Sequence, residues 1–415
     1  MKVLLVSEDL PAPQLGGAGK HAVLLGNALL EAGHHVEMLG QTRAPGVETT
    51  NGFAGRIRAD IDLSHTGAKE QALGVFHALR RLHIAHRLWG AIRRCGPDWD
   101  VIHYHGHIPL LGALVPAGIN FVHTLHDQGS ECIIKIRFRD NEPCRARNPA
   151  ICAGCATLRP NVLQTYVSAH AVRSLRGMAR TAFTRHQAIF VSQFLENRFR
   201  EIVGPAPLRA HVVHNFIDSS QVRRALQNTE RASASSDGRP KVFLAGRMDR
   251  AKGFSAFFDA MPDGLLQRLN VSVAGDGPDL PELQQRHAGR GVHFLGWRDL
   301  DSVLLAAARA DACVVPSVWE EPCGTTVLES LALGRPVFAL ARGGTPELVA
   351  YQQHPGQLRL FDQMQDLVAA LGTAESIAPA IAVDGRSDVR ARLPAILDVY
   401  ESGRVSACTE TGRRA

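Results

Sequence analysis

The chain has 415 residues, of which 45% are hydrophobic, a length that fits two domains of about 150 to 200 residues each. Its apolar runs stay well short of the ~18 residues of a membrane-spanning helix, which argues against an integral membrane protein. The net charge of +6 comes from residues 1–200, which hold 23 Lys and Arg against 15 Asp and Glu. A basic half of this kind can face nucleic acid, anionic lipid or a phosphorylated substrate.

The first residues, MKVLLVSEDLPAP, predict a β-strand rather than a signal peptide, because acids and prolines follow only a few apolar residues. Without an export signal, the eight cysteines are expected to be mostly free thiols in a reducing cytoplasm.

Short apolar runs alternate with longer helical patterns along the first half of the chain, which is the rhythm of a parallel α/β sheet. The predicted strands of this first series are Val3–Val6, Val36–Leu39, Val101–Tyr104, Phe121–Leu125, Ala188–Val191 and His211–Val213. A second series follows at Val242–Ala245, Val271–Ala274, Val292–Leu295, Ala312–Ser317 and Pro336–Leu340. Residues 219–240, rich in Ser and charge, are predicted to be a linker between two domains.

Residues Phe76–Arg94 form a basic amphipathic pattern, FHALRRLHIAHRLWGAIRR. The pattern suits a helix that covers a sheet, and it also suits a helix on an anionic membrane surface. We favour the covering helix, with its arginine face turned toward a membrane.

A glycine-rich segment and a histidine-rich segment are each compatible with another function. Gly17-Ala-Gly19-Lys-His-Ala22, with Glu37 twenty residues after Gly17, matches the dinucleotide motif of an NAD-dependent oxidoreductase. However, eight residues separate the first strand from Gly16, whereas that motif follows its strand directly. His103, His105 and His107 alternate like metal ligands on one strand face, but buried or loop histidines are the favoured interpretation.

Four cysteines follow the predicted strand Phe121–Leu125 with the spacing C-x11-C-x7-C-x2-C: Cys132, Cys144, Cys152 and Cys155. Four thiolates can hold a structural zinc ion in a tetrahedral site. Because the long gaps are unlike those of a standard zinc ribbon, structural zinc and free thiols stay equally open.

In the second half of the chain, one segment offers cations and another offers carboxylates. In VFLAGRMDRAKG, a strand ends near Gly246 and is followed by Arg247 and Lys252. In PSVWEEPCGTTVLES, Glu321 and Glu329 stand eight residues apart, around a helix predicted to begin near Thr325. Eight residues on a helix would leave both carboxylates on one face, with Glu321 beside the free N–H groups at the helix start. Cations, N–H donors and carboxylates together suit a ligand that carries phosphates and sugar hydroxyls.

The series of motifs resembles the retaining, metal-independent glycosyltransferases of family 4. It comprises Gly16-Gly17, VHTLHD (122–127), FVSQF (190–194), VVHNFID (212–218), AGRMDRAKG, VAGDGP (273–278), FLGW (294–297), the Glu321–Glu329 block and ARGGTPELV (341–349). The resemblance runs in order from about Lys2 to about Leu348. It implies a GT-B fold, in which two Rossmann-like, doubly wound parallel-sheet domains face each other across a cleft.

The resemblance also implies roles for single residues. His126 would contact the donor sugar, Glu321 its hydroxyls and Glu329 the nucleotide ribose. Arg247 and Lys252 would neutralise the departing diphosphate together with the helix start at Gly324, Thr325 and Thr326. Gly16 and Gly17 would let donor and acceptor approach the backbone, and Arg298 would lie near the base. A similar cysteine-bearing insertion, here 128–160, occurs in a subset of the family.

The implied organisation is an acceptor-side domain at 1–218, the linker at 219–240, a nucleotide-sugar domain at 241–385, a helix at 386–403 that crosses back, and a disordered tail at 404–415. The implied function is hexosyl transfer from a nucleotide-diphosphate sugar to a glycan or lipid-linked acceptor in cell-surface polysaccharide or glycolipid synthesis. No cofactor is expected for catalysis beyond the open question of structural zinc. We expect a cytoplasmic protein with peripheral contact to the inner face of an anionic membrane, and no nucleic-acid partner. The alternatives are a sugar-nucleotide epimerase of the same fold and an NAD-dependent oxidoreductase.

Overall fold

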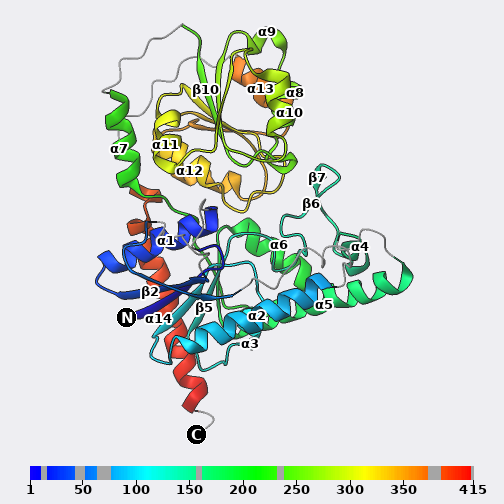
Figure 1. The fold of residues 1–415 in the computed structure, drawn as a ribbon, viewed down its shortest axis with the longest axis vertical. Helices are drawn as coiled ribbons and strands as arrows, with labels where there is room; N and C mark the ends of the chain where they lie inside the picture. Colours follow the sequence, from blue (N-terminus) through cyan, green and yellow to red (C-terminus); the bar gives the residue numbers. More distant parts are fainter. Residues whose placement is uncertain are drawn as a thin grey trace. The chain divides into compact units, whose positions relative to one another are not determined.

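The computed structural model describes residues 1–10, 16–42, 52–62, 76–155, 161–230, 238–372 and 385–412, leaving out the side chains of 76–80, 230 and 405–412. The chain divides into two compact units (Figure 1). The N-terminal unit comprises Met1–Arg137, Arg145–His214 and Arg392–Ala415, and the C-terminal unit comprises Phe138–Cys144 and Asn215–Ala391.

The N-terminal unit contains a parallel sheet of seven strands in the order β3-β2-β1-β4-β5-β8-β9. The strands are β1 (Lys2–Val6), β2 (His35–Gln41), β3 (Arg56–Ile61), β4 (Val101–Tyr104), β5 (Phe121–Leu125), β8 (Gln187–Phe190) and β9 (Ala210–Val212). Both faces of the central strands are buried, which explains their continuous apolar runs. In this sheet the sequence missed β3, an edge strand whose mostly half-exposed residues RIRADI lack such a run. In the C-terminal unit it missed the edge strand β15 (Leu358–Phe361), which is also mostly half-exposed.

Helices cover this sheet: α1 (Gly17–Glu31), α2 (Phe76–Arg94), α3 (Leu111–Leu114), α5 (Val162–Arg185) and α6 (Gln193–Val203). Helix α2 has the predicted bounds, and its residues Leu88, Ala91 and Ile92 are buried in the core, as expected of a covering helix. Two of its arginines form ion pairs, Arg87 with Asp62 at 2.8 Å and Arg94 with Asp60 at 2.9 Å.

The segment after β5 forms a compact excursion with a short hairpin, β6 (Phe138–Arg139) and β7 (Glu142–Pro143), and a short helix, α4 (Pro149–Ala153). Two buried arginines from the covering helices hold its backbone. Arg81 of α2 donates to the carbonyl oxygens of Gly129 and Ile133, both at 2.8 Å. Arg176 of α5 donates to the Glu131 carbonyl at 3.0 Å and to the Cys152 sulfur at 3.2 Å.

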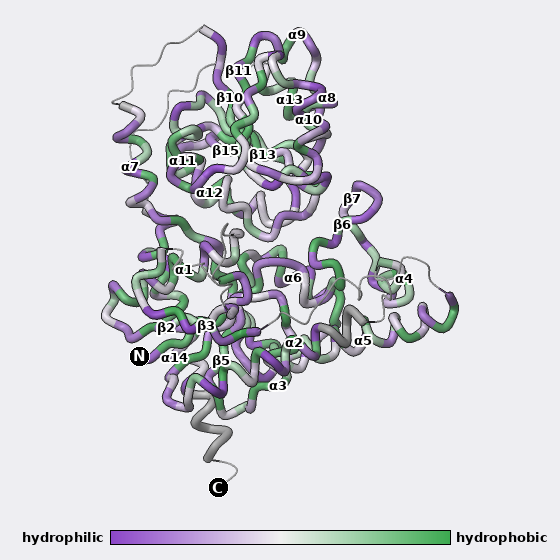
Figure 2. The backbone as a smooth tube through the Cα atoms, in the orientation of Figure 1, coloured by the Kyte–Doolittle hydropathy of each residue, from purple (hydrophilic) through white to green (hydrophobic). Residues whose placement is uncertain are grey.

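The C-terminal unit contains a second parallel sheet, with six strands in the order β12-β11-β10-β13-β14-β15. The strands are β10 (Lys241–Ala245), β11 (Asn270–Ala274), β12 (Val292–Gly296), β13 (Ala312–Val315), β14 (Val337–Leu340) and β15 (Leu358–Phe361). Figure 2 shows hydrophobic residues concentrated along the inner strands of this unit. The two doubly wound parallel sheets confirm the predicted fold class.

The helical elements of the C-terminal unit are α7 (Ser219–Glu230), η2 (Arg250–Lys252), α8 (Phe254–Ala260), α9 (Asp263–Leu266), α10 (Leu280–His287), α11 (Leu300–Ala308), α12 (Thr325–Ala332), η3 (Thr345–Tyr351), α13 (Met364–Gly372) and η4 (Gly385–Ser387). Helix α7 corrects the prediction of a linker at 219–240. It packs against α11 and buries Val222 and Ala225, so an apolar stripe with helical spacing outweighed the polar composition. Residues 231–237 lie outside the described part.

The last helix, α14 (Val389–Gly412), continues through Pro394 and belongs to the N-terminal unit from Arg392 onward. Its Tyr400 hydroxyl lies 2.7 Å from Nδ1 of His103, and its Tyr400 carbonyl accepts a hydrogen bond from Asn120 at 2.9 Å. The predicted helix that joins the N-terminal domain is therefore present. The disordered tail predicted from residue 404 is wrong, because the helix extends to Gly412.

None of the helices in the described segments combines the length and the apolar character needed to cross a membrane.

Candidate active site

The strand order of each unit reverses direction beside its first strand, and ligands of open α/β sheets bind outside the carboxyl ends of the strands at such a point. In the C-terminal unit this point lies between β10 and β13. In the N-terminal unit it lies between β1 and β4. The predicted residues of the Arg247–Glu329 region and the Gly16–Gly17 pair follow strands beside these two points, whereas His126 and the four cysteines follow β5 and Arg298 follows β12.

The loop after β10 presents the two predicted cations. Asp249 shapes this loop, because its carboxylate accepts a hydrogen bond from the backbone N–H of Lys252 at 3.0 Å and pairs with Arg247 at 2.6 Å. Gly253 then turns the chain with φ of +75°, and a Cβ there would lie 2.0 Å from the carbonyl oxygen of Pro316. Glycine is thus needed for the loop after β10 to touch the loop after β13.

Glu321 lies in the loop after β13 and is only 6% exposed. Its carboxylate pairs with the ammonium group of Lys252 and accepts a hydrogen bond from the Ser317 hydroxyl at 2.8 Å. Burial raises the pKa of Glu321, but Lys252 and the hydrogen bonds outweigh it, so the pKa falls below its usual value. The ammonium group also lies 5.3 Å from the centre of the Trp319 ring. The Glu321 carboxylate is therefore charged beside the ammonium group of Lys252.

Helix α12 begins at Thr325, with Gly324 as an N-cap that offers no side chain to its first N–H groups. Thr325 and Thr326 are half-buried, and Glu329 follows one turn later. Glu321 precedes the helix and does not share its face with Glu329, which corrects the argument from the spacing of eight residues. The uncapped helix start is a site where backbone N–H groups can bind a phosphate.

The loop after β14 fixes the backbone of Glu321. The N–H group of Gly344 donates to the Glu321 carbonyl at 2.7 Å. Gly343 has φ of +61°, and a Cβ there would lie 2.2 Å from the same carbonyl oxygen. Loops after three neighbouring strands, β10, β13 and β14, thus hold the Lys252–Glu321 pair.

Arg298 is separate from this pair. It is exposed in the loop after the edge strand β12, two strands away from β10, and Asp299 beside it caps α11. The structure thus brings Arg247, Lys252 and Glu321 into one cluster with the start of α12, and it leaves Arg298 at the far end of the same sheet edge.

In the N-terminal unit, Gly16 caps α1 without a side-chain hydrogen bond, and Gly17 is the first helical residue. Both glycines are exposed, and a Cβ at either would meet no described atom within 4 Å. This open helix start supports the expected approach of a ligand to the backbone. It also shows that the motif Gly17-Ala-Gly19 lies within the helix, away from the end of β1 at Val6.

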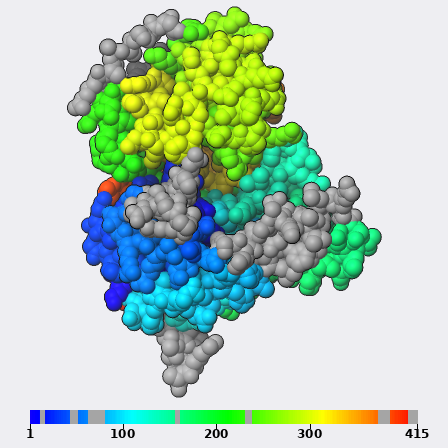
Figure 3. Space-filling model, in the orientation of Figure 1, coloured from blue at the N-terminus to red at the C-terminus, as the bar shows by residue number. Residues whose placement is uncertain are grey.

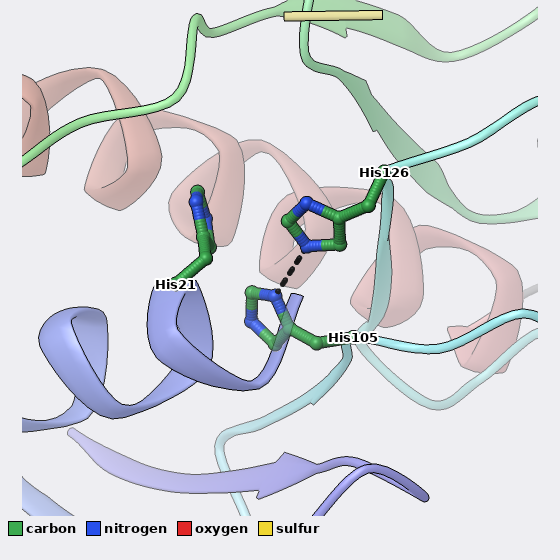
Figure 4. A group of neighbouring side chains, drawn as sticks. All are labelled: His21, His105 and His126. Carbon is green, nitrogen blue, oxygen red and sulfur yellow. Dashed lines mark hydrogen bonds between the residues drawn. The ribbon is translucent and has the colours of Figure 1, made fainter. Parts of the chain in front are cut away.

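His126 directly follows β5 and is half-buried, and it lies beside two further histidines (Figure 4). Its Nε2 is 3.3 Å from Nδ1 of His105, which follows β4, and its ring centre is 4.6 Å from that of His21 on α1. Burial, with cationic His107 nearby, lowers the pKa of His126 to about 3. Burial also lowers the pKa of His105 well below its usual value. Both rings are therefore neutral near pH 7.

The other two histidines of the H-x-H-x-H segment have structural partners. His103 lies between the hydroxyls of Tyr400 and Thr124, each at 2.7 Å. His107 contacts the carboxylates of Asp127 at 2.6 Å and Asp9 at 3.5 Å, which the sequence reading did not connect with it. Burial opposes its charge, but these carboxylates raise the pKa of His107 to about 10. The favoured interpretation of buried or loop histidines holds for His103 and His107.

The four cysteines do not form a compact ligand set in the described part of the chain, and no disulfide joins them there. Burial raises the pKa of the Cys132 thiol to about 11, and the Cys152 sulfur accepts the hydrogen bond from Arg176. The zinc prediction gains no support from this geometry and stays a prediction.

Several neighbours of the site were missed from the sequence. Asp249 lies in the motif VFLAGRMDRAKG, and Ser317 and Trp319 lie in PSVWEEPCGTTVLES. Their roles follow only from the contact between the three loops. His21 and His105 join His126 from separate segments. The signal that could have found them is a histidine after each of two adjacent parallel strands, since such strands end at the same sheet edge.

Comparisons with known proteins agree with this arrangement. Residues 15–221 match the family model described as "Glycosyltransferase Family 4", and residues 239–381 match the one described as "Glycosyl transferases group 1". Among curated proteins, the glycogen synthase of Mycobacterium tuberculosis is 24% identical over 371 residues, which are 84% of this chain and 80% of that protein. A GDP-mannose-dependent phosphatidylinositol monomannoside mannosyltransferase of Mycolicibacterium smegmatis is 29% identical over 199 residues, 42% of this chain and 51% of that protein.

Solved structures share the fold at low sequence identity. Sucrose-phosphate synthase from Thermosynechococcus elongatus has a TM-score of 0.62 and 18% identity, covering 99% of this chain and 94% of that one. HepE of Anabaena, solved in complex with UDP, has a TM-score of 0.61 and 19% identity, covering 97% of this chain and 100% of that one. At these identities the likeness establishes the fold alone.

Proposed function

The chain belongs to glycosyltransferase family 4 and has the GT-B fold, and we propose that it transfers a hexosyl group, with retention of configuration, from a nucleoside-diphosphate sugar to a glycan or lipid-linked acceptor. The product would enter a cell-surface polysaccharide or glycolipid. The oxidoreductase and epimerase alternatives find no support, because the family models match both halves of the chain.

One observation carries the proposal: the Lys252–Glu321 pair lies among loops at the carboxyl ends of β10, β13 and β14, in the same unit as the uncapped start of α12. A nucleoside-diphosphate sugar needs cations and N–H donors for its phosphates and a carboxylate for its sugar hydroxyls. Fixed cations and N–H donors stabilise the negative charge that develops on the leaving diphosphate.

The residues divide this work. Lys252 and Arg247 would neutralise the diphosphate, and the N–H groups of Thr325 and Thr326 would donate to it. Glu321, held in place by Ser317 and Gly344, would accept hydrogen bonds from the sugar. Glu329 would do the same for the ribose.

In the bond-changing step, the bond between the anomeric carbon and the phosphate oxygen breaks while the acceptor oxygen bonds to that carbon on the same face. The acceptor proton passes to the departing phosphate oxygen, so the leaving group is its own base. Neutral His126 would hydrogen-bond a sugar hydroxyl without adding charge.

We also propose peripheral contact with an anionic membrane, but at α5 rather than at α2. Val162 (89% exposed), Leu163 (71%) and Tyr166 (74%) lie in the first turns of α5. The green atoms of this part of the chain reach the surface in Figure 3. The segment 151–200 carries seven Arg and one Glu. An apolar helix end in a basic segment suits insertion between anionic headgroups. The covering helix α2, in contrast, uses Arg87 and Arg94 in ion pairs.

The test is release of nucleoside diphosphate by the purified chain from a panel of UDP-, GDP-, ADP- and dTDP-sugars. Lys252→Ala should lower turnover about a hundredfold, since one such contact is worth about 3 kcal/mol. Arg250→Ala removes an exposed cation of the same loop and should leave turnover near the wild-type value. Equal activity of the Lys252→Ala variant and wild type would refute the assignment. NMR of the product tests retention, which requires the anomeric configuration of the donor.

A further inference from the structure

The three imidazoles of His21, His105 and His126 come from three separate elements: the second turn of α1, the residue after β4 and the residue after β5 (Figure 4). Each offers one ring nitrogen, and these nitrogens all lie within 4.8 Å of one another. Among the described residues, these three side chains form the group of His, Cys, Asp or Glu residues whose ligand atoms lie close enough together to hold one metal ion.

The spacing fits a common metal ion. Zinc–nitrogen bonds are about 2.0–2.1 Å long, so two nitrogens of a tetrahedral site are about 3.4 Å apart. Nδ1 of His105 and Nε2 of His126 are 3.3 Å apart. The ring of His21 lies beside this pair, with its centre 5.3 Å from that of His105 and 4.6 Å from that of His126.

The rings are held by rigid surroundings. His105 is fully buried, and its ring centre lies 4.0 Å from that of His103, which two hydroxyls fix in place. Nε2 of His105 is buried without a hydrogen-bond partner among the described residues. His21 is 5% exposed on a helix that packs against β2. Ligands on such elements need little rearrangement to bind an ion.

We propose that His21, His105 and His126 form a three-nitrogen site for a divalent transition-metal ion such as Zn²⁺ or Co²⁺, with a fourth position open to an oxygen ligand. Three imidazole nitrogens suit these ions. The site is separate from the cysteines of the excursion after β5. Ion binding does not depend on the proposed transferase reaction, although an ion on His126 would compete with a sugar for that ring.

Two other groups could bind the same ions and serve as controls. His83 and His86 are exposed and three residues apart on α2, a spacing at which two side chains can share a surface ion. The cysteines would bind Co²⁺ through sulfur, which gives an intense thiolate-to-cobalt absorption band that imidazole ligands do not give.

The experiment titrates the purified full chain with Co²⁺, using visible absorption and equilibrium dialysis. Wild type should bind one ion with tetrahedral absorption bands and nitrogen ligands. His21→Gln should weaken its binding at least tenfold, while the double variant His83→Gln/His86→Gln and Cys152→Ser should retain it. If the cysteines also bind an ion, the thiolate band should disappear in Cys152→Ser and the nitrogen-bound ion should remain.

Unchanged binding in His21→Gln, or loss of binding in the His83→Gln/His86→Gln variant, would overturn the proposal. X-ray absorption of the zinc-loaded Cys152→Ser variant, which should lack any ion bound by the cysteines, keeps it testable if His21→Gln does not fold. Three imidazole ligands are expected in that spectrum, and a sulfur shell or a shell without imidazole contradicts the site. Because none of these measurements uses a sugar, their failure is distinguishable from failure of the proposed function.

Discussion

At the scale of single residues, the Lys252–Glu321 pair is the most informative feature of the C-terminal unit. Glu321 has 8% of its side chain exposed and Lys252 has 28%, so the carboxylate has lost most of its water and the ammonium group only part. Removing one partner of such a pair leaves the other charge buried. The pair therefore links stability to the site that we assign to the donor.

This link predicts a pH-dependent loss of stability in Lys252→Ala. The folded-state pKa of Glu321 is lowered, so its stabilising contribution is present above the ordinary value near 4.5 and is lost as the pH falls through the folded value. Lys252→Ala should therefore cost about 2 kcal/mol of unfolding free energy at pH 7, less than for a fully buried pair. The cost should shrink below pH 4.5. Urea denaturation at pH 7 and pH 4 measures it, and a difference that stays constant with pH would contradict the account.

At the scale of elements, the loops at the carboxyl ends of the strands position the site, and they do so by close backbone contact. Gly253 and Gly343 stand where one loop touches another, each at positive φ. A side chain at either position would meet a backbone carbonyl oxygen and push the two loops apart. Because Lys252 and Glu321 lie in these loops, such a change would displace one of them. Local geometry of the loops thus controls the chemistry of the site.

We predict that Gly253→Ala lowers both stability and turnover. The new methyl group would clash with the Pro316 carbonyl, and alanine at φ of +75° is strained, which together should cost more than about 1 kcal/mol. The control is Gly264→Ala in α9, where a Cβ meets nothing within 4 Å among the described atoms. That change should leave stability equal or slightly higher. Thermal denaturation and turnover measurements compare the two variants. A Gly253→Ala variant as stable as Gly264→Ala would disprove the packing argument.

The exposed end of α5 makes a second prediction for an element. The double change Val162→Asp/Leu163→Asp should reduce binding to vesicles that contain phosphatidylserine, because it places charge where apolar side chains would insert. Ser174→Asp adds a carboxylate at an exposed position further along α5 and should reduce binding much less. Co-sedimentation with anionic and neutral vesicles measures both. Equal binding of wild type to the two kinds of vesicle, or of the double variant and wild type, would exclude this surface.

At the scale of the whole molecule, the chain builds the same doubly wound arrangement twice and places different chemistry on each sheet. The C-terminal unit gathers cations, a carboxylate and an uncapped helix start. The N-terminal unit gathers histidines and the open start of α1. In the proposed assignment, Arg247 and Lys252 take the part that a bound divalent ion plays in a metal-dependent enzyme.

Transfer should accordingly continue after removal of divalent ions, if Arg247 and Lys252 neutralise the leaving group as we propose. The measurement is turnover after exhaustive EDTA treatment, followed by addition of Mg²⁺, Mn²⁺ or Zn²⁺. Restoration of a lost activity by Mg²⁺ or Mn²⁺ would mean that an acidic group binds the diphosphate through an ion. The matched control is Cys152→Ser: if the cysteines hold zinc, wild type should contain one equivalent that this variant lacks, and acceptor use should suffer more than nucleotide binding.

The sequence by itself determined most strands of the two parallel series and singled out Lys252 and Glu321 as site residues, although it did not predict that the two form a pair. Central strands of a parallel sheet are buried on both faces, so each leaves a continuous apolar run, as in Val101–Tyr104 and Phe121–Leu125. Helix α2 was predicted for a similar reason, since its apolar stripe is local. The roles within the pair came from resemblance, because one sequence contains no distances.

Only the tertiary structure decided which distant residues meet. It made residues 219–230 a helix through contact with α11 and placed Glu321 before the helix that carries Glu329. It joined His21, His105 and His126 and left the four cysteines without a compact arrangement in the described part of the chain. These outcomes depend on packing between segments far apart in the chain, whereas periodicity and composition report only on neighbours along it.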